Sequence, residues 1–423
     1  MVHPYLNRRN GREPVDYIDD RFNATLERTL GVPIFQEQIL QMAMIIADFT
    51  GSEAEELRRA ISFHRSDERM AKVLQKLTAA MRRKGVPPQT QDRVVKSIRS
   101  FALYGFPESH AISFALLAYA SAWLKAHRAP EFYAALLNNQ PMGFYSPATL
   151  VKDARRHGIR VRPVCVAQSE VPTAVESDEA IRLGFRQVKG LSRAAAERIA
   201  AERGRRPWRD LADFAIRARL SKAERRTLAR IGALNALADH RRDALWRVEE
   251  DIDPESLFAW ASQSQSQSQT LNSKPSTPPQ LAKMTPPERL ESDYAGLDLT
   301  TGPHPVAYLR DQLAAEGILR AIDVPDARPG SRVTIAGMVI CRQRPGSAKG
   351  HVFVSLEDET GIANAFIHGD RFPAMRLIVN QEPFLKLTGT LQKTPEAVTS
   401  IYVHEAAALH FGAAVAGQSH DYY

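Results

Sequence analysis

The first 150 residues carry apolar side chains at the three- and four-residue spacing of amphipathic helices. In the segment 31–50, five of them share one helix face: Ile39, Met42, Ala43, Ile46 and Phe49. Positions i, i+3, i+4 and i+7 lie on the same side of an α-helix, so this spacing indicates a helix packed against a core. We therefore predict a mostly α-helical domain over residues 1–150.

Capping residues mark the helix ends in this region. Thr50, with Glu53 three positions later, forms the capping-box pattern that begins a helix over 52–61. The next segment, DERMAKVLQKLTAAMRRKG, ends in basic residues that complement the helix dipole and in Gly85. These signals predict two further helices in the same domain.

The most apolar stretch, residues 101–141, reads FALYGFPESHAISFALLAYASAWLKAHRAPEFYAALLNNQP. Ser109 is a candidate N-cap for a helix from about 110 to 127. Apolar side chains lie on every side of this helix, which is typical of a buried helix. Three basic residues at its C-terminal end complement the helix dipole: Lys125, His127 and Arg128. The pattern predicts a central core helix.

Residues 151–248 form a mixed segment with two predicted strands and two loosely repeated helical units. Each unit couples a short helix to a glycine-containing hairpin, VKGL at 188–191 and IGAL at 231–234. This arrangement is typical of tandem helix–hairpin–helix elements, whose hairpin amides hold a nucleic-acid phosphate. The candidate DNA contacts are Lys189, Gly190, Arg230 and Gly232. A plain tight turn and ordinary surface charge are the alternatives at these positions.

From residue 330 the apolar period changes from helical spacing to two. A Ser/Gln/Pro linker is predicted over 249–287 and a helical connector over 288–329. Five strands then follow, with one short helix between the third and the fourth. This order describes an all-β OB-fold barrel over 330–410, followed by a loose tail over 411–423.

The loop between the first two barrel strands is the best candidate nucleic-acid contact in the barrel. It carries three cations beside glycine and proline: Arg342, Arg344 and Lys349. The first loop of an OB-fold commonly contacts nucleic acid. Phe353 and Phe366 are either stacking platforms for bases or core residues, and strand aromatics favour the core interpretation.

Composition narrows the class of partner. The chain has 423 residues, a formal net charge of +8 and two cysteines. The excess of base points to a polyanionic partner, and the cysteine count excludes a disulfide framework and a Cys-rich zinc module. No apolar run reaches the length of a membrane span, and the first residues lack the apolar region of a secretory signal. We expect a cytoplasmic protein without a membrane partner.

The acidic residues do not form a convincing catalytic site. The one Asp-x-Asp pair, Asp251 and Asp253, lies beside the Ser/Gln repeat, where an acidic run is usually solvated. The cluster 357–359 precedes Gly361 in a turn, where acids and glycine are normal. We therefore predict neither a catalytic residue nor a metal site in this chain.

Long motifs resemble one family in order along the chain. They include PIFQEQ (33–38), YGFPESHAISFALLAYASAWLKAHRAPEF (104–132), LLNNQPMGFYSP (136–147), DARRHGIRVRPV (153–164) and RQRPGSAKGHVFVSLEDETG (342–361). The chain closely resembles the bacterial error-prone DNA polymerases, C-family enzymes related to the DNA polymerase III α subunit. By this resemblance, residues 1–150 are a fingers domain, and Arg58 and Arg59 in its LRRA motif contact the incoming dNTP. Lys125, His127 and Arg128 would then face DNA.

The resemblance also implies an activity and partners. The family reaction is template-directed nucleotidyl transfer with Mg²⁺, in damage-induced mutagenesis and translesion DNA synthesis. The implied partners are primer–template DNA, single-stranded template and dNTP, together with a sliding clamp and a Y-family-like accessory protein.

The chain departs from the family pattern in two places. In the family, a PHP domain and a palm with the magnesium-binding aspartates come first, whereas this chain resembles the family only beyond those motifs. We therefore expect a C-terminal portion that lacks its own catalytic carboxylates, with a palm half supplied separately as one option. The alternatives are a stand-alone helix–hairpin–helix and OB-fold nucleic-acid binder, or a non-catalytic truncated remnant. The segment 169–184 also departs from the family and is expected to be less regular.

Overall fold

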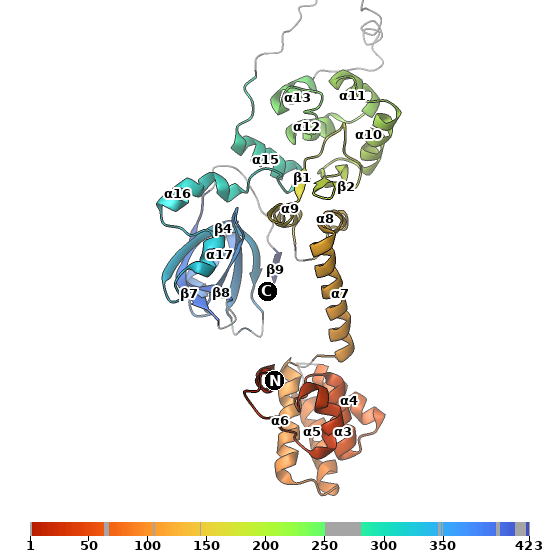
Figure 1. The fold of residues 1–423 in the computed structure, drawn as a ribbon, viewed down its shortest axis with the longest axis vertical. Coiled ribbons are helices and arrows are strands. Elements are labelled where there is room, and N and C mark those ends of the chain that lie inside the picture. Colours follow the sequence, from red (N-terminus) through yellow and green to blue (C-terminus); the bar gives the residue numbers. More distant parts are fainter. Residues whose placement is uncertain are drawn as a thin grey trace, which may run out of the picture. The chain divides into compact units, whose positions relative to one another are not determined.

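The computed structural model describes residues 2–62, 67–104, 106–143, 145–249, 281–345, 348, 350–394, 398–410 and 420–422. Asp251 and Asp253 lie outside the described residues, as does the predicted linker between 250 and 280. The chain divides into two compact units, Met1–Trp123 and Leu124–Tyr423. The elements of both are drawn in Figure 1.

The first unit is helical, as the sequence predicted. Its elements are α1 (Val2–Arg9), η1 (Asp20–Phe22), α2 (Asn23–Leu26), η2 (Glu27–Thr29), α3 (Gln36–Ala47), α4 (Gly51–Ser62), α5 (Asp67–Arg83), α6 (Pro88–Tyr104) and most of α7 (Glu108–His127). The predicted apolar face of α3 is buried in one hydrophobic cluster with Leu57 of α4 and Leu77 of α5. The capping box is also confirmed, because Thr50 N donates to Glu53 Oε2 at 2.9 Å and Glu53 N donates to Thr50 Oγ1 at 3.3 Å.

The predicted core helix forms, but the prediction that it is buried is wrong. None of the described side chains of α7 is buried, and Leu116 and Tyr119 are 67% and 74% exposed. The boundary between the two units falls at Trp123, inside α7, and neither adjoining hydrophobic cluster includes an α7 residue. Apolar character all round therefore did not imply a buried position. Ser109 is not the N-cap either, because α7 begins at Glu108.

The second unit begins with a mixed module that continues into a helical connector. Its elements are α8 (Ala129–Asn138), α9 (Pro147–Arg156), β1 (Arg160–Arg162), β2 (Ala174–Ser177), β3 (Ala180–Arg182), η3 (Phe185–Gln187), α10 (Arg193–Arg205), α11 (Leu211–Ala218), α12 (Lys222–Arg230), α13 (Arg241–Arg247), α15 (Pro286–Leu297), η4 (Pro305–Leu309), α16 (Arg310–Ala315) and η5 (Ala321–Asp326). The small sheet has the order β1-β3-β2. The segment 169–184, expected to be less regular, therefore contributes two paired strands.

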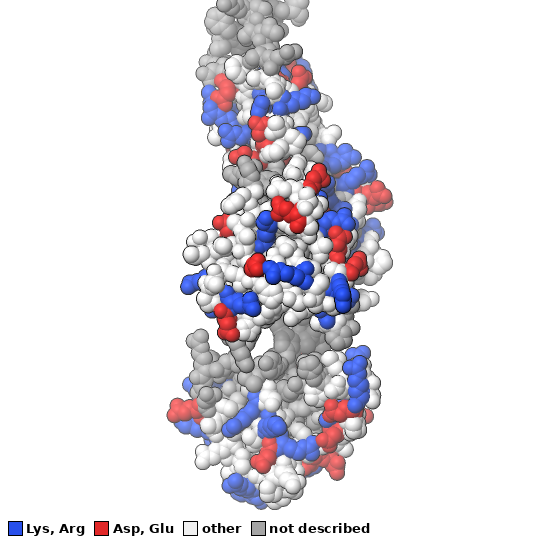
Figure 2. Space-filling model, turned by 90° about the vertical axis from the view of Figure 1, so that its left-hand side faces the viewer, with Lys and Arg blue, Asp and Glu red and all other residues white. Residues whose placement is uncertain are grey.

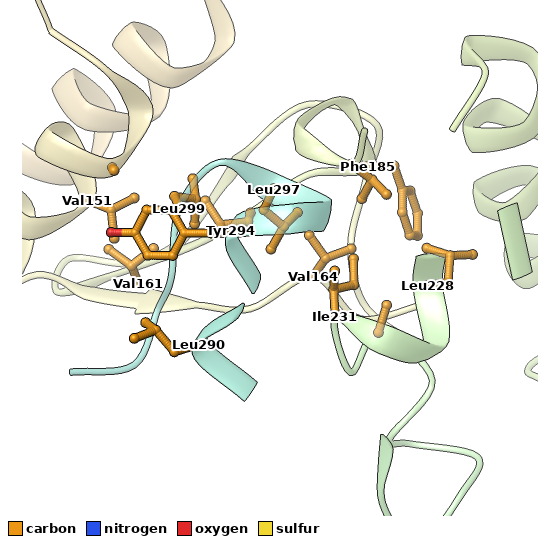
Figure 3. Packing of buried hydrophobic residues seen from close by; sticks show 14 of the residues in the cluster. Val151, Val161, Val164, Phe185, Leu228, Ile231, Leu290, Tyr294, Leu297 and Leu299 are labelled. Carbon is orange, nitrogen blue, oxygen red and sulfur yellow. The ribbon is translucent and has the colours of Figure 1, made fainter. Parts of the chain in front are cut away.

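One hydrophobic cluster holds this module together. Figure 3 shows Tyr294 and Leu299 lying beside Val151 of α9 and Val161 of β1. Leu228, at the end of α12, belongs to the same buried cluster. Because α15 follows the linker in sequence, its apolar side chains pack the segment after the linker against the helices and strands before it. Burial of apolar side chains of this size stabilises such a contact by roughly 1.5–3 kcal/mol each.

The C-terminal part is a closed barrel with the strand and helix order expected of an OB-fold. Its elements are β4 (Arg332–Gln343), β5 (Val352–Glu357), β6 (Ile362–Ile367), α17 (Phe372–Gln381), β7 (Phe384–Lys393), β8 (Thr399–Ala408) and β9 (His420–Tyr422). The sheet order is β5-β6-β8-β7-β4-β9, and β5 also pairs with β4, which closes the barrel. Figure 1 shows α17 beside the strands. Within the predicted tail, β9 is an ordered strand that pairs in parallel with β4.

A buried ion pair joins α9 to the barrel. Arg156 Nη2 donates a hydrogen bond to Oε1 of Glu357, which is fully buried at the end of β5. Burial raises the pKa of Glu357 to about 7, although the Arg156 guanidinium opposes this shift. The adjoining acids Asp358 and Glu359 accept hydrogen bonds from Arg310 at 3.3 and 3.0 Å. The acidic cluster that we expected in an ordinary turn is therefore also an anchoring point of the barrel.

Candidate nucleic-acid interface

Three aromatic side chains lie side by side across one outer face of the barrel. The strand register pairs Phe353 of β5 with Phe366 of β6, and Phe366 with Tyr402 of β8. Directly paired residues on neighbouring strands point to the same face of a sheet, so the register itself aligns the rings. The ring centroids are 5.4 Å apart between Phe353 and Phe366 and 5.8 Å apart between Phe366 and Tyr402.

The alternation along each strand explains why these rings point outward. In β5 the buried positions are Val352, Val354 and Leu356, so Phe353 falls on the opposite face and is 41% exposed. The preference for a core position, which we derived from the sequence, is therefore wrong for Phe353. Phe366 is partly exposed for the same reason, because its neighbours along β6 are buried.

Histidines extend the three aromatic side chains into a longer surface, which we call the aromatic row. It consists of His351, Phe353, Phe366, His368, Tyr402 and His404. The ring centroids of His351 and His368 are 4.4 Å apart, and those of Tyr402 and His404 are 5.3 Å apart. The Arg371 guanidinium lies 5.9 Å from the Tyr402 centroid. Our sequence analysis had not named Tyr402, Arg371 or these histidines.

A concavity lined by aromatic, apolar and polar side chains lies at the aromatic row. The concavity has a volume of about 430 Å³, and its lining includes Phe353, Phe366, Gln343, Gln392, Ser355, Asn364 and Ser400. Ser355 Oγ donates to Asn364 Oδ1 at 2.8 Å, which holds two of these polar groups in place. Exposed rings offer stacking surfaces to bases, and neighbouring amides and hydroxyls offer hydrogen bonds to base edges. The arrangement suits an unpaired nucleic-acid strand.

The three cations predicted in the first barrel loop lie in different environments. Arg344 is exposed, with its guanidinium 5.1 Å from the Phe372 ring centroid. Arg342 lies within β4 and is only 4% exposed. Its guanidinium donates to the carbonyls of Val379 and Glu382 at 2.5 and 2.6 Å, so it fastens α17 to the barrel instead of forming part of an exposed loop. Lys349 lies outside the described residues.

The first predicted hairpin is open at its glycine. Gly190 has a φ of +72°, a conformation that glycine adopts more easily than other residues, and the space that a Cβ would enter there is empty to 4 Å. The Gly190 N–H donates no hydrogen bond to the described part of the chain. The neighbouring Lys189 forms an ion pair with Asp298, and its N–H donates to the Gly296 carbonyl at 2.8 Å. The hairpin is therefore fixed to α15 while Gly190 stays accessible.

The second predicted hairpin is closed by a side chain. A Cβ on Gly232, whose φ is +78°, would meet Arg241 Nε at 2.7 Å. The Gly232 N–H donates to the Ala229 carbonyl at 3.1 Å. Arg230 is exposed on α12, and its side chain forms no hydrogen bond or ion pair with the described part of the chain. At this hairpin the Arg230 side chain is therefore accessible to a phosphate, whereas the Gly232 N–H already donates to a backbone carbonyl.

Arg230→Ala tests whether the second hairpin contacts DNA. We expect a three- to fivefold loss of affinity for DNA, and a salt dependence lower by about one phosphate contact, because one exposed cation is removed. Fluorescence anisotropy over a range of salt concentrations measures both quantities. Arg320→Ala is the matched control, since Arg320 is an exposed arginine paired with Asp323 in the connector. Equal salt slopes for the wild type and Arg230→Ala would exclude this contact.

The predicted dNTP contacts lie together on α4. Arg58 donates to Glu55 at 2.7 and 2.8 Å, and Arg59 donates to the same carboxylate at 3.0 Å. These hydrogen bonds, chiefly the one from Arg58, lower the pKa of Glu55 to about 2. Both side chains are substantially exposed. A triphosphate would therefore bind beside the Glu55 carboxylate or replace it as their acceptor, and the dNTP role stays a prediction.

The predicted basic end of α7 is partly engaged by acids of the second unit. Lys125 Nζ donates to Asp153 Oδ2 at 2.7 Å, and Arg128 lies 3.5 Å from Glu131. Burial tends to raise the pKa of Asp153, but hydrogen bonds from Lys125 and Tyr133 lower it below its usual value. His127 is exposed. Lys125 thus fastens α7 to α9, and DNA contact by these three residues stays a prediction.

On the face drawn in Figure 2, positive and negative side chains are mixed and no region of the described surface carries charge of one sign alone. Figure 2 shows Lys and Arg side chains interspersed with Asp and Glu on the face in view. In the described part of the chain, no three His, Cys, Asp or Glu side chains gather as potential metal ligands. No helix among the described residues has both the length and the hydropathy needed to cross a bilayer. Binding of DNA here would depend on local contacts at the aromatic row and the hairpins.

Three family models match successive parts of the chain. Residues 1–85 match the bacterial DNA polymerase III alpha subunit finger domain. Residues 158–244 match the helix-hairpin-helix motif, and residues 333–408 match the OB-fold nucleic acid binding domain. Among solved structures, asparaginyl-tRNA synthetase from Pyrococcus horikoshii covers 23% of the chain at 16% identity, with a TM-score of 0.20. That likeness is too weak to carry an argument.

Curated relatives match nearly the whole chain. The error-prone DNA polymerase of Alkalilimnicola ehrlichii is 45% identical over 93% of the chain. Error-prone DNA polymerase 2 of Agrobacterium fabrum is 42% identical over 94%, and the error-prone DNA polymerase of Anaeromyxobacter sp. is 41% identical over 100%. The chain spans only 37–38% of the length of these relatives. It is therefore a homologue of part of the error-prone DNA polymerases, with their finger, helix–hairpin–helix and OB-fold segments.

Proposed function

We propose that this chain binds single-stranded template DNA and contacts dNTP as part of an error-prone DNA polymerase. The observation that carries the proposal is the aromatic row on the OB-fold barrel, with Phe353, Phe366 and Tyr402 in register on three adjacent strands. Base–aromatic stacking tolerates every sequence because every base has a π-face. A polymerase that follows a template of any sequence needs this kind of contact.

The reaction we assign to the complete enzyme is template-directed nucleotidyl transfer. A primer 3′ hydroxyl attacks the α-phosphate of the dNTP, the bond to pyrophosphate breaks, and pyrophosphate leaves. The chemistry depends on metal ions held by carboxylates, which position the reactants and stabilise the developing charge. In the proposal, Arg58 and Arg59 bind the triphosphate of the dNTP, with guanidinium forks that match phosphate oxygens. The error-prone relatives support a role in translesion synthesis and damage-induced mutagenesis.

A further polymerase segment is the partner that we propose for this chain. Four large apolar side chains of α7 are 54–67% exposed, namely Ile112, Phe114, Leu116 and Leu117. Exposed apolar side chains grouped on one element mark an interaction surface. A palm segment packed there would remove this surface from solvent and would bring the catalytic carboxylates. A sliding clamp and a Y-family-like accessory protein are the other partners suggested by the family.

We expect no primer extension by this chain alone with Mg²⁺ and dNTP. The three matched segments are a finger domain, a helix–hairpin–helix motif and an OB-fold, whereas the family places its magnesium-binding carboxylates in a palm. A gel-based extension assay with rigorously purified protein measures this directly. Template-dependent extension that survives purification would show that the chain carries its own catalytic site and would contradict the assignment.

Salt titration of DNA binding tests the proposed interface. We expect the logarithm of the affinity to fall linearly with the logarithm of the salt concentration, because cations at the interface release counterions from DNA. Arg344→Ala with Lys349→Ala is expected to lower the slope by about one or two phosphate contacts. An unchanged affinity and slope would show that the first barrel loop does not contact DNA. No measurable DNA binding by the folded wild type would contradict the proposed function itself.

A further inference from the structure

The turn Gly302-Pro303-His304-Pro305 places a buried histidine against α9 and the barrel. His304 is 3% exposed and is the N-cap of η4. Its Nδ1 accepts a hydrogen bond from Val306 N at 3.2 Å, so in the neutral ring the hydrogen is on Nε2. That Nε2–H makes no hydrogen bond with the described chain, although the buried carboxylate oxygen Glu357 Oε2 lies 3.9 Å away. A buried donor without an acceptor is costly, so it marks a place where an acceptor belongs.

The last two turns of α9 bring three cations to the same place. Together with His304, residues Lys152, Arg155 and Arg156 line a cavity of about 380 Å³. Lys152 is 5% exposed, and its Nζ donates to the Gly302 carbonyl at 2.7 Å. In the described structure, no carboxylate lies within ion-pair distance of it. Burial, with a further contribution from Arg155, lowers the pKa of Lys152 to about 7, while the Glu357 carboxylate opposes this shift.

Unpartnered donors outnumber unpartnered acceptors around this cavity. Besides His304 Nε2, the buried atoms Arg156 Nε and Arg310 Nη1 have no hydrogen-bond partner in the described chain, whereas the only such carboxylate oxygen is Glu357 Oε2. The acid in the cavity lining, Glu359, is already paired with Arg310. Even with Glu357 Oε2 assigned to His304 Nε2, which lies 3.9 Å away, the two arginine N–H groups remain without an acceptor, so the cavity still calls for further acceptor atoms. A buried water molecule supplies two acceptor sites but no charge.

We propose that the cavity formed by Lys152, Arg155, Arg156 and His304 is a binding site for a phosphate group. A phosphate oxyanion offers acceptors in several directions, and guanidinium and ammonium groups are its usual protein partners. Arg155 lies exposed at the site, where it also donates to the Thr301 carbonyl at 3.0 Å. The phosphate group comes either from free phosphate or from the end of a nucleic-acid strand. The site is separate from the aromatic row and does not depend on it.

Thermal unfolding of the full chain in phosphate and in chloride, at equal ionic strength and pH, tests the site. We expect phosphate to raise the unfolding midpoint of the wild type by roughly 2–4 °C, because a ligand that binds only the folded state stabilises it. Arg155→Ala, an exposed position that should fold normally, is expected to lose most of this shift. His304→Phe, which keeps the ring volume but removes the donor, is expected to lose it as well.

Arg160→Ala is the matched control, because Arg160 is an exposed arginine near α9 that pairs with Glu179 on the small sheet. It should keep the full phosphate shift. The proposal is overturned if phosphate and chloride give equal midpoints for the wild type, or if Arg155→Ala and His304→Phe keep the wild-type shift. Wild-type DNA binding without any phosphate shift would contradict this site while leaving the proposed function intact.

A comparison of short oligothymidines with a 5′ phosphate and a 5′ hydroxyl distinguishes the two sources. Tighter binding of the 5′-phosphorylated strand by about fivefold, lost in Arg155→Ala, would identify a strand end as the source. Equal binding of the two strands, together with the phosphate shift in unfolding, would identify free phosphate. Both outcomes are interpreted together with the phosphate shift of the wild type, and the absence of that shift overturns the site whichever strand binds more tightly.

Discussion

Replacing both Phe353 and Tyr402 by alanine is expected to weaken binding of single-stranded DNA by about 30- to 100-fold. Each stacked base contributes roughly 1–3 kcal/mol, and the double variant removes the two outer rings of the three that the register aligns. Fluorescence anisotropy with a labelled oligothymidine measures the change. The salt dependence should stay close to that of the wild type, because the phosphate-binding cations are unaltered.

Tyr308→Ala is the control for this variant. Tyr308 is an exposed aromatic in η4, outside the aromatic row, and its replacement should change the affinity less than about twofold. Circular dichroism should show that all three proteins are folded, because the replaced rings lie on the outer face of the barrel or on the connector. A loss of less than threefold in the double variant would mean that bases do not stack on this face.

Arg156→Met is expected to destabilise the second unit by about 3–5 kcal/mol at about pH 8. The substitution leaves the fully buried Glu357 carboxylate without its ion-pair partner, and an unpaired buried charge is costly. Adding Glu357→Leu removes the charge and should recover most of the loss. Chemical denaturation followed by tryptophan fluorescence is suitable, because Trp208 is buried in this unit. A double variant as unstable as the single variant would contradict a role for the ion pair.

The pH dependence gives an independent check on the same pair. The folded-state pKa of Glu357, about 7, lies above the usual carboxyl value, so its contribution to stability is complete below about pH 4.5 and is lost as the pH rises through 7. The Arg156→Met loss should therefore be smaller at about pH 5, where Glu357 is protonated even in the wild type. Glu357→Gln should flatten the wild-type decline over this interval. Lys152 has the opposite effect. Its folded-state pKa is lowered to about 7, so stability increases as the pH rises from about 7 toward the usual lysine pKa of 10.5.

The barrel could be predicted from the sequence because its signals are local. Strand period, turn residues and the place of one helix describe a closed barrel, and β4 to β8 with α17 follow that order. The same alternation of buried and exposed positions also predicts which strand aromatics face solvent. Val352, Val354 and Leu356 occupy the buried positions of β5, so the intervening Phe353 had to face outward. Reading that alternation, instead of the general preference of aromatics for cores, would have found the aromatic row.

The predictions that failed depend on contacts between residues far apart in sequence, which the local spacing of apolar and polar residues does not describe. The composition of α7 predicted burial, but burial also requires packing partners on every side of the helix, and none of the described α7 side chains is buried. Arg342 was assigned to a loop because a sequence does not define the exact residue at which a strand ends. In the structure, β4 continues through Arg342. The phosphate cavity joins α9 to a turn 150 residues later through Lys152 and Gly302, a separation at which sequence patterns contain no distance information.

Photocrosslinking of oligonucleotides containing 5-iodouracil tests the central claim most directly, because it reports which side chains stack on bases. With the purified chain and single-stranded DNA, we expect the crosslinked peptides to carry Phe353, Phe366 or Tyr402, and the yield to fall in the double alanine variant. Efficient crosslinks confined to peptides outside β5, β6 and β8 would contradict the account of how this chain binds DNA.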